Sequence, residues 1–207
     1  MNLIVAICKK NNGIGFENKI PWYIKEELQY FKSVTTSGNK NVVIMGRNTW
    51  ESLPKKPLPN RVNVVITSRI YDDSIITYSS LSQAYQAYHD YDNVMVIGGE
   101  RLYQEALQHP NLNKVYVTEI YQEYECDKFF PKLQDSLKLV EISKFKQENG
   151  IFYRNKVYSK YGKQIINQEE TKYLELLKNI LEEGERVQSR NAITYRLFSN
   201  VLTYDLR

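Results

Sequence analysis

Short apolar runs alternate with amphipathic stretches through residues 1–120, and this alternation limits the folds open to the chain. The apolar runs are residues 3–7, 42–45, 62–66, 94–97 and 115–117. The periodicity between them predicts helices at residues 24–34, about 48–52, 81–88 and 100–107. Continuous apolar runs are typical of strands buried on both faces of a sheet. The sequence therefore predicts an α/β domain with a mostly parallel sheet and helices on both faces.

The pattern changes towards residue 138. Residues 138–142 and 152–158 have the character of strands, and Asn149-Gly150 between them is a turn signal. We therefore predict that these two strands form a final antiparallel hairpin, which would make the sheet mixed.

Composition limits the functional classes. Of 207 residues, 42% are hydrophobic and 25% charged, as in globular proteins with a packed core. The net charge of +4 comes from scattered Lys and Arg residues, so we expect no nucleic-acid partner, and no apolar run is long enough to suggest a membrane partner. Cys8, Cys126, His89 and His109 lack the spacing of metal ligands, so we expect no metal site. Residues 1–13 turn polar too early for a signal peptide, and we expect a soluble cytoplasmic protein.

Two stretches with paired glycines have alternative interpretations. Gly13-Ile14-Gly15 lacks the third glycine of a dinucleotide fingerprint, because Asn18 stands there and no helix opens at the motif. It is either a plain loop after the first strand or a mobile loop that closes over a ligand. Gly98-Gly99 separates a predicted strand from a predicted helix, where it suits either a tight turn or the close approach of a phosphate.

Polar groups and glycines follow three of the predicted strands at their carboxyl ends, where the ligands of open α/β sheets bind. They are Gly46, Arg47 and Thr49, then Thr67, Ser68 and Arg69, and finally Gly98 and Gly99. The arginines and hydroxyl groups could bind a phosphate monoester through charge-assisted hydrogen bonds. Binding of the 2′-phosphate in this way would select NADPH over NADH.

Glu27 is the carboxylate with the strongest chemical case. It shares one side of a predicted helix with Leu28 and Phe31, so its surroundings are partly apolar and should raise its pKa. Such a carboxyl can hydrogen-bond a nitrogen heterocycle. In the alternative interpretation Glu27 lies at the exposed rim of the helix and has no chemical role, as we expect for Lys25 and Glu26.

In combination these motifs resemble dihydrofolate reductase over residues 1–161. The matching stretches, in order, are IVAICKKNNGIGFENKIPW, EELQYF, VVIMGRNTWESLP, PLPNRVNVVITSR, VMVIGGERLYQEAL, KVYVTEI, CDKFFP and FYRNKVY. The resemblance implies that family's mixed sheet, mostly parallel with a C-terminal antiparallel hairpin. It also implies the NADPH-dependent reduction of dihydrofolate to tetrahydrofolate, which supports one-carbon metabolism and thymidylate synthesis.

The resemblance further implies roles for single residues. Glu27 would bind the pterin and assist protonation of its N5, Thr118 would hydrogen-bond Glu27, and Trp22 would hold a bridging water. The substrate-binding residues implied are Ile7, Leu28, Phe31, Ser52, Leu53, Leu58 and Arg61, the last paired with the α-carboxylate of the glutamate tail. The cofactor-binding residues implied are Ala6, Ile14, Ile20, Gly46, Arg47, Thr49, Thr67, Ser68, Arg69, Ile97, Gly98, Gly99, Arg101, Leu102 and Tyr103. Gly98 and Gly99 would be joined by a cis peptide, and either Ser68 or Arg69 would contact the 2′-phosphate.

Residues 171–207, after a polar linker at 162–170, resemble the start of thymidylate synthase. Their apolar spacing predicts an amphipathic helix at 171–183. Arg190 aligns with that family's phosphate-binding arginine, although NAITYRLF departs from its usual Thr-Gly repeats. The sequence stops before the family's catalytic cysteine, so we expect no synthase activity. It resembles the reductase part of a bifunctional reductase–synthase, cut early in the second domain or with that domain decayed. A full fusion would form a homodimer through its synthase domain.

Two other functions are open on sequence grounds. Another pterin or pyrimidine reductase of the same fold would generally lack counterparts of Glu27 and Arg61, and both are present here. A non-catalytic module that binds folate or NADPH would have gaps among the pocket residues, and the sequence has none.

Overall fold

The computed structural model describes residues 1–69, 71, 74–162, 185–188 and 193–196. Contacts divide the chain into two compact units, Met1–Gln164 and Ile165–Arg207. In the second unit, β12 (Glu185–Gln188) pairs antiparallel with β13 (Ile193–Arg196). The amphipathic helix predicted at 171–183 and the aligned Arg190 lie outside the described residues.

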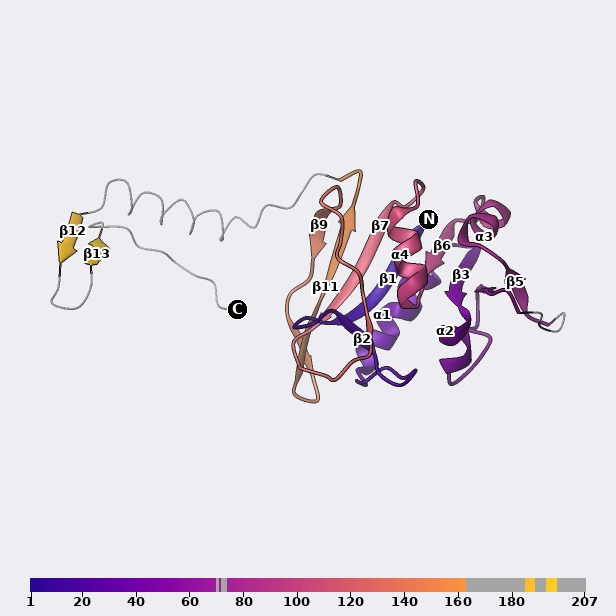
Figure 1. The fold of residues 1–207 in the computed structure, drawn as a ribbon, viewed down its shortest axis with the longest axis horizontal. Helices are drawn as coiled ribbons and strands as arrows, with labels where there is room; N and C mark the ends of the chain where they lie inside the picture. Colours follow the sequence, from indigo (N-terminus) through magenta and orange to yellow (C-terminus); the bar gives the residue numbers. More distant parts are fainter. Residues whose placement is uncertain (70, 72–73, 163–184, 189–192, 197–207) are drawn as a thin grey trace. The chain divides into compact units, whose positions relative to one another are not determined.

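The first unit is built on one mixed sheet with the strand order β10-β11-β7-β1-β6-β3-β4-β5. Figure 1 labels β11, β7, β1, β6, β3 and β5 of this order. The parallel strands are β1 (Asn2–Cys8), β3 (Asn41–Gly46), β4 (Val62–Ile66), β5 (Ile76–Tyr78), β6 (Asn93–Val96) and β7 (Lys114–Ile120). The antiparallel strands are β2 (Gly13–Gly15), β8 (Lys128–Phe129), β9 (Lys138–Ile142), β10 (Lys146–Glu148) and β11 (Ile151–Ser159). The predicted fold class is confirmed.

Helices cover both faces of this sheet, as the apolar runs predict. The helices are α1 (Lys25–Thr35), α2 (Arg47–Ser52), α3 (Leu81–Tyr88) and α4 (Glu100–Gln108). On β3, Val42 and Ile44 pack with the apolar side chains of α3 and α4, whereas Val43 and Met45 pack with Trp50 of α2 and with α1. Successive side chains of a strand point to opposite faces, so two separate cores form around the same strands.

The predicted C-terminal hairpin is wrong in one respect. Residues 138–142 form β9, which does pair antiparallel with β11. The turn at Asn149-Gly150, however, joins β11 to the additional short strand β10, and both turn residues have positive φ angles of 52° and 80°. The polar sequence of β10, Lys-Gln-Glu, carries no apolar signal that would have predicted a strand.

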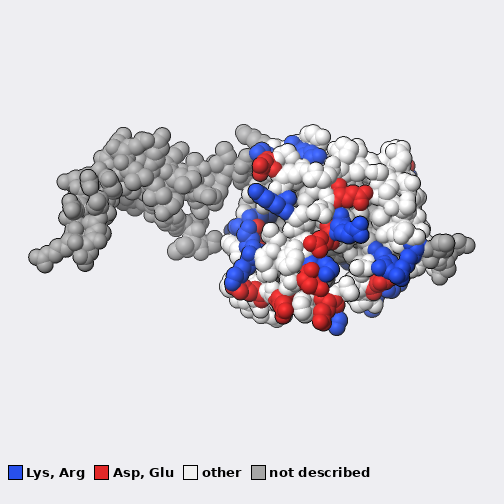
Figure 2. Space-filling view, in the orientation of Figure 1, with Lys and Arg blue, Asp and Glu red and all other residues white. Residues whose placement is uncertain are grey.

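The surface of the described part carries mixed charge. On the face drawn in Figure 2, Lys and Arg side chains are interspersed with Asp and Glu side chains. No helix in the described ranges is both long and apolar enough to cross a membrane.

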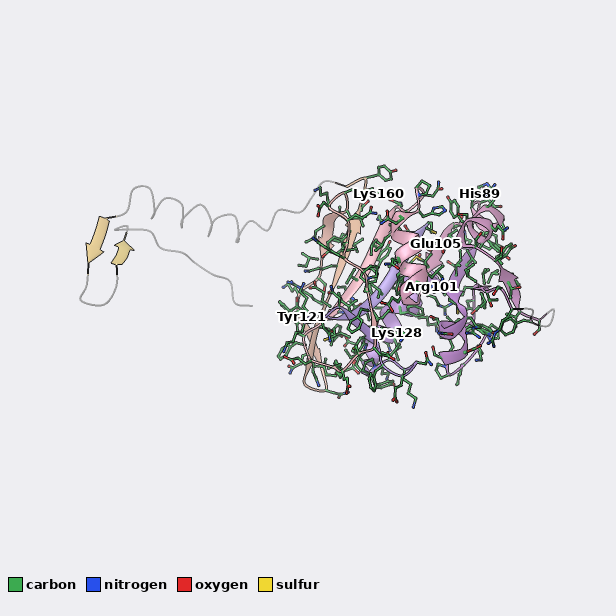
Figure 3. The ribbon with its side chains drawn as sticks, in the orientation of Figure 1. His89, Arg101, Glu105, Tyr121, Lys128 and Lys160 are labelled. Atoms are coloured by element: carbon green, nitrogen blue, oxygen red, sulfur yellow. The ribbon has the colours of Figure 1, made fainter. Side chains whose placement is uncertain are left out.

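A buried carboxylate joins β7 to β11. The side chain of Glu119 is 3% exposed and forms ion pairs with Lys9 (3.0 Å), Arg154 (3.2 Å) and Lys156 (2.8 Å). Tyr121, labelled in Figure 3, donates its hydroxyl to the same carboxylate at 2.7 Å. Burial alone would raise the pKa of Glu119, but the hydrogen bonds from these neighbours outweigh it and lower the pKa to about 2.

We predict that Glu119→Gln destabilises the protein by about 3 kcal/mol at pH 7, because it leaves the buried Lys156 and the half-buried Arg154 without a counter-ion. The folded pKa lies below the ordinary value of 4.5, so the stabilisation is complete above about pH 5 and is lost as the pH falls towards 2. Urea denaturation of both proteins at pH 7 and pH 3 should therefore show a smaller difference at pH 3.

The matched control is Glu123→Gln, which removes the exposed partner of Lys10. Exposed ion pairs contribute little, so this variant should unfold at the wild-type urea concentration. A difference between Glu119→Gln and wild type that stays constant with pH would contradict the prediction.

Candidate functional site

Glu27 lies in the first turn of α1 and is 7% exposed. Burial raises the pKa of its carboxyl to about 7, and no hydrogen bond in the described part of the chain lowers it. A carboxyl with a pKa near the working pH can both accept and donate a proton. The structure thus agrees with the expectation that this side of the helix is buried or half-buried and that the pKa of Glu27 is raised.

The indole of Trp22 offers a hydrogen-bond donor close to this helix. Trp22 packs with Ile24, which directly precedes α1, and with Ala6 of β1. Its Nε1 is the one buried side-chain polar atom of the described residues without a hydrogen-bond partner. Buried polar groups normally have partners, so this N–H is suited to a water molecule or a ligand.

Thr118 does not make the hydrogen bond expected of it. It is fully buried on β7, in register with Ala6 of β1 on one side and Asn155 of β11 on the other. Its Oγ1 accepts from Asn155 Nδ2 at 2.9 Å, and the structure contains no hydrogen bond between Thr118 and Glu27. A hydroxyl that already accepts one bond still has a proton to donate.

Arg61 is held with its guanidinium in a fixed place. Nε donates to the carbonyl of Pro59 at 2.9 Å, and Nη1 donates to Thr35 Oγ1. The guanidinium carbon lies 5.9 Å from the centre of the Phe31 ring. Two of the five N–H donors are used in this way, and the remaining ones can bind a carboxylate.

The other predicted substrate residues divide into two groups. Phe31, Leu53 and Leu58 pack on the α1 side of the sheet, and Leu28 is 45% exposed beside them on α1. Ile7 instead packs on the opposite face with the side chains of α4, so its placement gives no support to a contact with the same ligand. The exposed Ser52 turns its hydroxyl back to the carbonyl of Thr49.

The predicted cofactor glycines meet at one edge of the sheet. Gly98 and Gly99 are joined by a cis peptide, as predicted, and the N–H of Gly46 donates to the carbonyl of Gly98 at 2.7 Å. A Cβ on Gly98 would lie 3.2 Å from the Tyr103 hydroxyl, and one on Gly99 would lie 3.3 Å from Thr49 Oγ1. Side chains at positions 98 and 99 would therefore crowd Tyr103 and Thr49, and glycine avoids this contact.

Tyr103 connects the glycine pair with the carboxyl site. Its buried hydroxyl donates to the carbonyl of Ile4 at 2.8 Å. Burial, and in addition the charge of Glu27, raise the pKa of Tyr103. Tyr103 therefore feels the charge of Glu27, and its hydroxyl also lies beside the position that a Cβ on Gly98 would take.

The phosphate-binding candidates lie at the ends of β3 and β4. The Thr67 hydroxyl accepts from the backbone N–H of Arg69 at 3.0 Å, and the side chains of Ser68 and Arg69 are exposed. Arg47 Nε lies 4.0 Å from the carboxylate of Glu51. Both Ser68 and Arg69 are free to reach an anion, so the structure does not choose between them.

The remaining cofactor candidates lie on α4, on β2 and in two connecting segments. Arg101 is exposed on α4 (Figure 3), whereas Leu102 is buried in the core beneath that helix. Ile97 is buried on the α1 side, and Ile20 is 60% exposed. Ile14 lies on β2, so Gly13-Ile14-Gly15 is a short strand rather than either kind of loop.

Comparison with known proteins decides the family. The family model described as dihydrofolate reductase matches residues 1–160. The chain belongs to the dihydrofolate reductase family. It is 34% identical to a dihydrofolate reductase of Aedes albopictus over 183 residues, 78% of this chain and 98% of that protein. It is 45% identical to a dihydrofolate reductase of Buchnera aphidicola over 134 residues, 64% of this chain and 80% of that protein.

A bifunctional dihydrofolate reductase-thymidylate synthase of Paramecium tetraurelia is 35% identical over 214 residues. The match covers 98% of this chain and 45% of that protein, so the chain spans less than half the length of this relative. Dihydrofolate reductases are NADPH-dependent oxidoreductases that reduce dihydrofolate, and this is the function of the chain.

Two contacts in this site were not predicted from the sequence. The Asn155 side chain donates a hydrogen bond to the Thr118 hydroxyl, and the Tyr103 hydroxyl donates one to the Ile4 carbonyl. The first depends on the register between β7 and β11, and the second on a backbone group. Neither leaves a signal in a single sequence.

We predict that Glu27→Gln stabilises the free protein more at pH 8.5 than at pH 5, by about 2 kcal/mol. The pKa of Glu27 is about 7 in the folded protein and near 4.5 when unfolded, so the cost of burying its charge grows as the pH rises from 4.5 through 7. Urea denaturation without ligands measures this difference. An equal effect at both pH values would mean that the Glu27 carboxyl is not buried as described.

Proposed function

We propose that Glu27 is the single catalytic carboxyl of the dihydrofolate reductase reaction in this chain. Among the described residues only Glu27 and Glu119 are buried carboxylates, and their pKa values are shifted in opposite directions. Glu27 is the one whose pKa lies near neutrality, and it follows Trp22 with its unpartnered indole N–H. This opposite shift is the observation that carries the proposal.

NADPH supplies the hydride for C6 of the pterin when it is bound. The role we propose for Glu27 is to bind the pterin amino group and N3, and to assist delivery of a proton to N5. The Trp22 indole holds a water beside the carboxyl. Leu28, Phe31 and the apolar side chains behind them exclude bulk water and hold the ring at reacting distance.

The cofactor would lie along the edge formed by the glycines. We propose that the cofactor lies against the backbone of Gly46, Gly98 and Gly99. The first N–H groups of α4 would donate to its phosphate oxygens, because Gly99 has no side chain to cap the helix. Arg47 together with Ser68 or Arg69 would bind the 2′-phosphate. Ser68 and Arg69 are exposed and Arg47 is half-buried, so all three are accessible to a phosphate, which favours the NADPH assignment.

The domain organisation is a further proposal. We propose a reductase domain of residues 1–161, a linker of 162–170 and a synthase-like segment of 171–207. Its support is that the match to the bifunctional Paramecium protein covers 98% of this chain, a share that includes most of 171–207. A fusion of this kind would dimerise through its synthase domain, and the transcript beyond codon 207 would show whether the rest of that domain follows.

We also propose a cytoplasmic location. Cys8 and Cys126 are both free thiols in the structure, as is usual for proteins of a reducing compartment.

We predict that Glu27→Gln lowers kcat/KM for dihydrofolate by about a hundredfold at pH 7, because a positioned acid or base contributes at least this much. The NADPH dissociation constant should stay within a factor of two. The reaction is followed by the loss of NADPH absorbance at 340 nm, and cofactor binding by fluorescence. A wild-type rate would refute the role of Glu27.

We predict that Arg61→Lys raises KM for dihydrofolate about tenfold with little change in kcat, since lysine cannot make a bidentate pair with a carboxylate. A dihydropterin without the glutamate tail is the matched control substrate, and its kinetics should not change. An equal effect on both substrates would instead assign Arg61 to the folding of the loop at Pro59.

A further inference from the structure

The helix that carries Glu27 has no cap of its own. Position 24 precedes α1 as its N-cap, and the residue there is Ile, which offers no hydrogen-bond acceptor in its side chain. Ile24 is 1% exposed and packs with Trp22, Cys8, Ile120 and Tyr153. An apolar residue that packs in the core therefore stands at the position where a Ser, Thr, Asp or Asn would normally cap the helix.

The missing cap comes from the far end of the domain. Glu148, the last residue of β10, accepts from the backbone N–H of Lys25 through Oε1 (2.8 Å) and from that of Glu26 through Oε2 (3.0 Å). These bonds lower the pKa of Glu148, so the carboxylate is charged at neutral pH. A negative charge at a helix N-terminus is also favoured by the helix dipole.

The same hairpin holds the side chain of Glu26. The hydroxyl of Tyr153 on β11 donates to Glu26 Oε2 at 2.7 Å, and Lys146 Nζ on β10 lies 3.7 Å from the same oxygen. Three residues of the β10-β11 hairpin thus fix the first turn of α1, at the residues that directly precede Glu27. We name Lys146, Glu148 and Tyr153 the hairpin clamp.

We propose that Glu148 is a positioning residue for the reaction, acting through Glu27. The inference rests on the catalytic role proposed for Glu27. Without the two backbone hydrogen bonds the first turn of α1 would fray, and the Glu27 carboxyl would spend less time facing the pterin. A displacement of about 1 Å at a reacting group can cost a large factor in rate. The NADPH edge at Gly98 is formed by other elements and would be unaffected.

A double-mutant cycle tests this proposal. The measured quantity is the rate of hydride transfer in a single turnover at pH 7, for wild type, Glu148→Ala, Glu27→Gln and the double variant. We expect Glu148→Ala to lower the rate about fivefold in the wild-type background and less than twofold in the Glu27→Gln background. Glu148→Gln retains one acceptor oxygen and should lose less than Glu148→Ala. The NADPH dissociation constant should change less than twofold in all of them.

Asp92→Ala is the matched control. Asp92 Oδ2 accepts from the backbone N–H groups of Asn39 and Lys40, both at 2.9 Å, so this change also removes two bonds between a carboxylate and consecutive backbone groups. These residues follow the C-terminal end of α1, away from Glu27. The control should lower the stability to urea as Glu148→Ala does, and should leave the rate of hydride transfer unchanged.

Three outcomes would overturn the proposal. Glu148→Ala could react at the wild-type rate, it could lower the rate by the same factor in both backgrounds, or Asp92→Ala could reproduce its effect. Failure of the role of Glu27 itself is recognised separately, because Glu27→Gln alone would then react at the wild-type rate.

Discussion

Parallel pairing of β1 with β6 on one side and β7 on the other is the constraint on which the rest of the domain depends. A parallel strand in this position is buried on both faces, so helices must cover both sides. The carboxyl ends of the parallel strands then meet at one edge, which brings Gly46, Thr67 and Gly98 together from distant parts of the sequence. Helix α1, which carries Glu27, lies on one face of the same sheet, and Tyr103 of α4 reaches from the other face to the Ile4 carbonyl.

The two buried carboxylates of the domain differ in what surrounds them. Glu119 has three cations and a tyrosine hydroxyl around it, which keep it ionised and make it a structural group. Glu27 has apolar neighbours and no hydrogen bond, so its charged form costs free energy that the fold does not recover. This unpaired burial raises the pKa of Glu27 to about 7, which is the property that its proposed catalytic role requires.

Apolar periodicity predicted the strands and helices because burial on one or both faces dictates those patterns. It identified Glu27 for the same reason, since Leu28 and Phe31 define the side of the helix. It could not predict β10, whose residues are polar, or the bond between Asn155 and Thr118, which depends on strand register. Ile7 was assigned by resemblance, and strand alternation places it on the opposite face from the pocket residues Phe31 and Leu58.

The hairpin clamp on α1 is a long-range contact that a single sequence does not predict, although the proposed role of Glu27 depends on it. Glu148 caps a helix 123 residues earlier in the chain, because Ile24 is needed for packing at the position where a local cap would stand. The first turn of α1 can therefore reach its full hydrogen bonding only after β11 has paired with β7 and with β10. The geometry of Glu27 depends in this way on the last hairpin of the domain. A site assembled from residues 22–31 alone would have the right chemical groups, but nothing to hold the carboxyl in place.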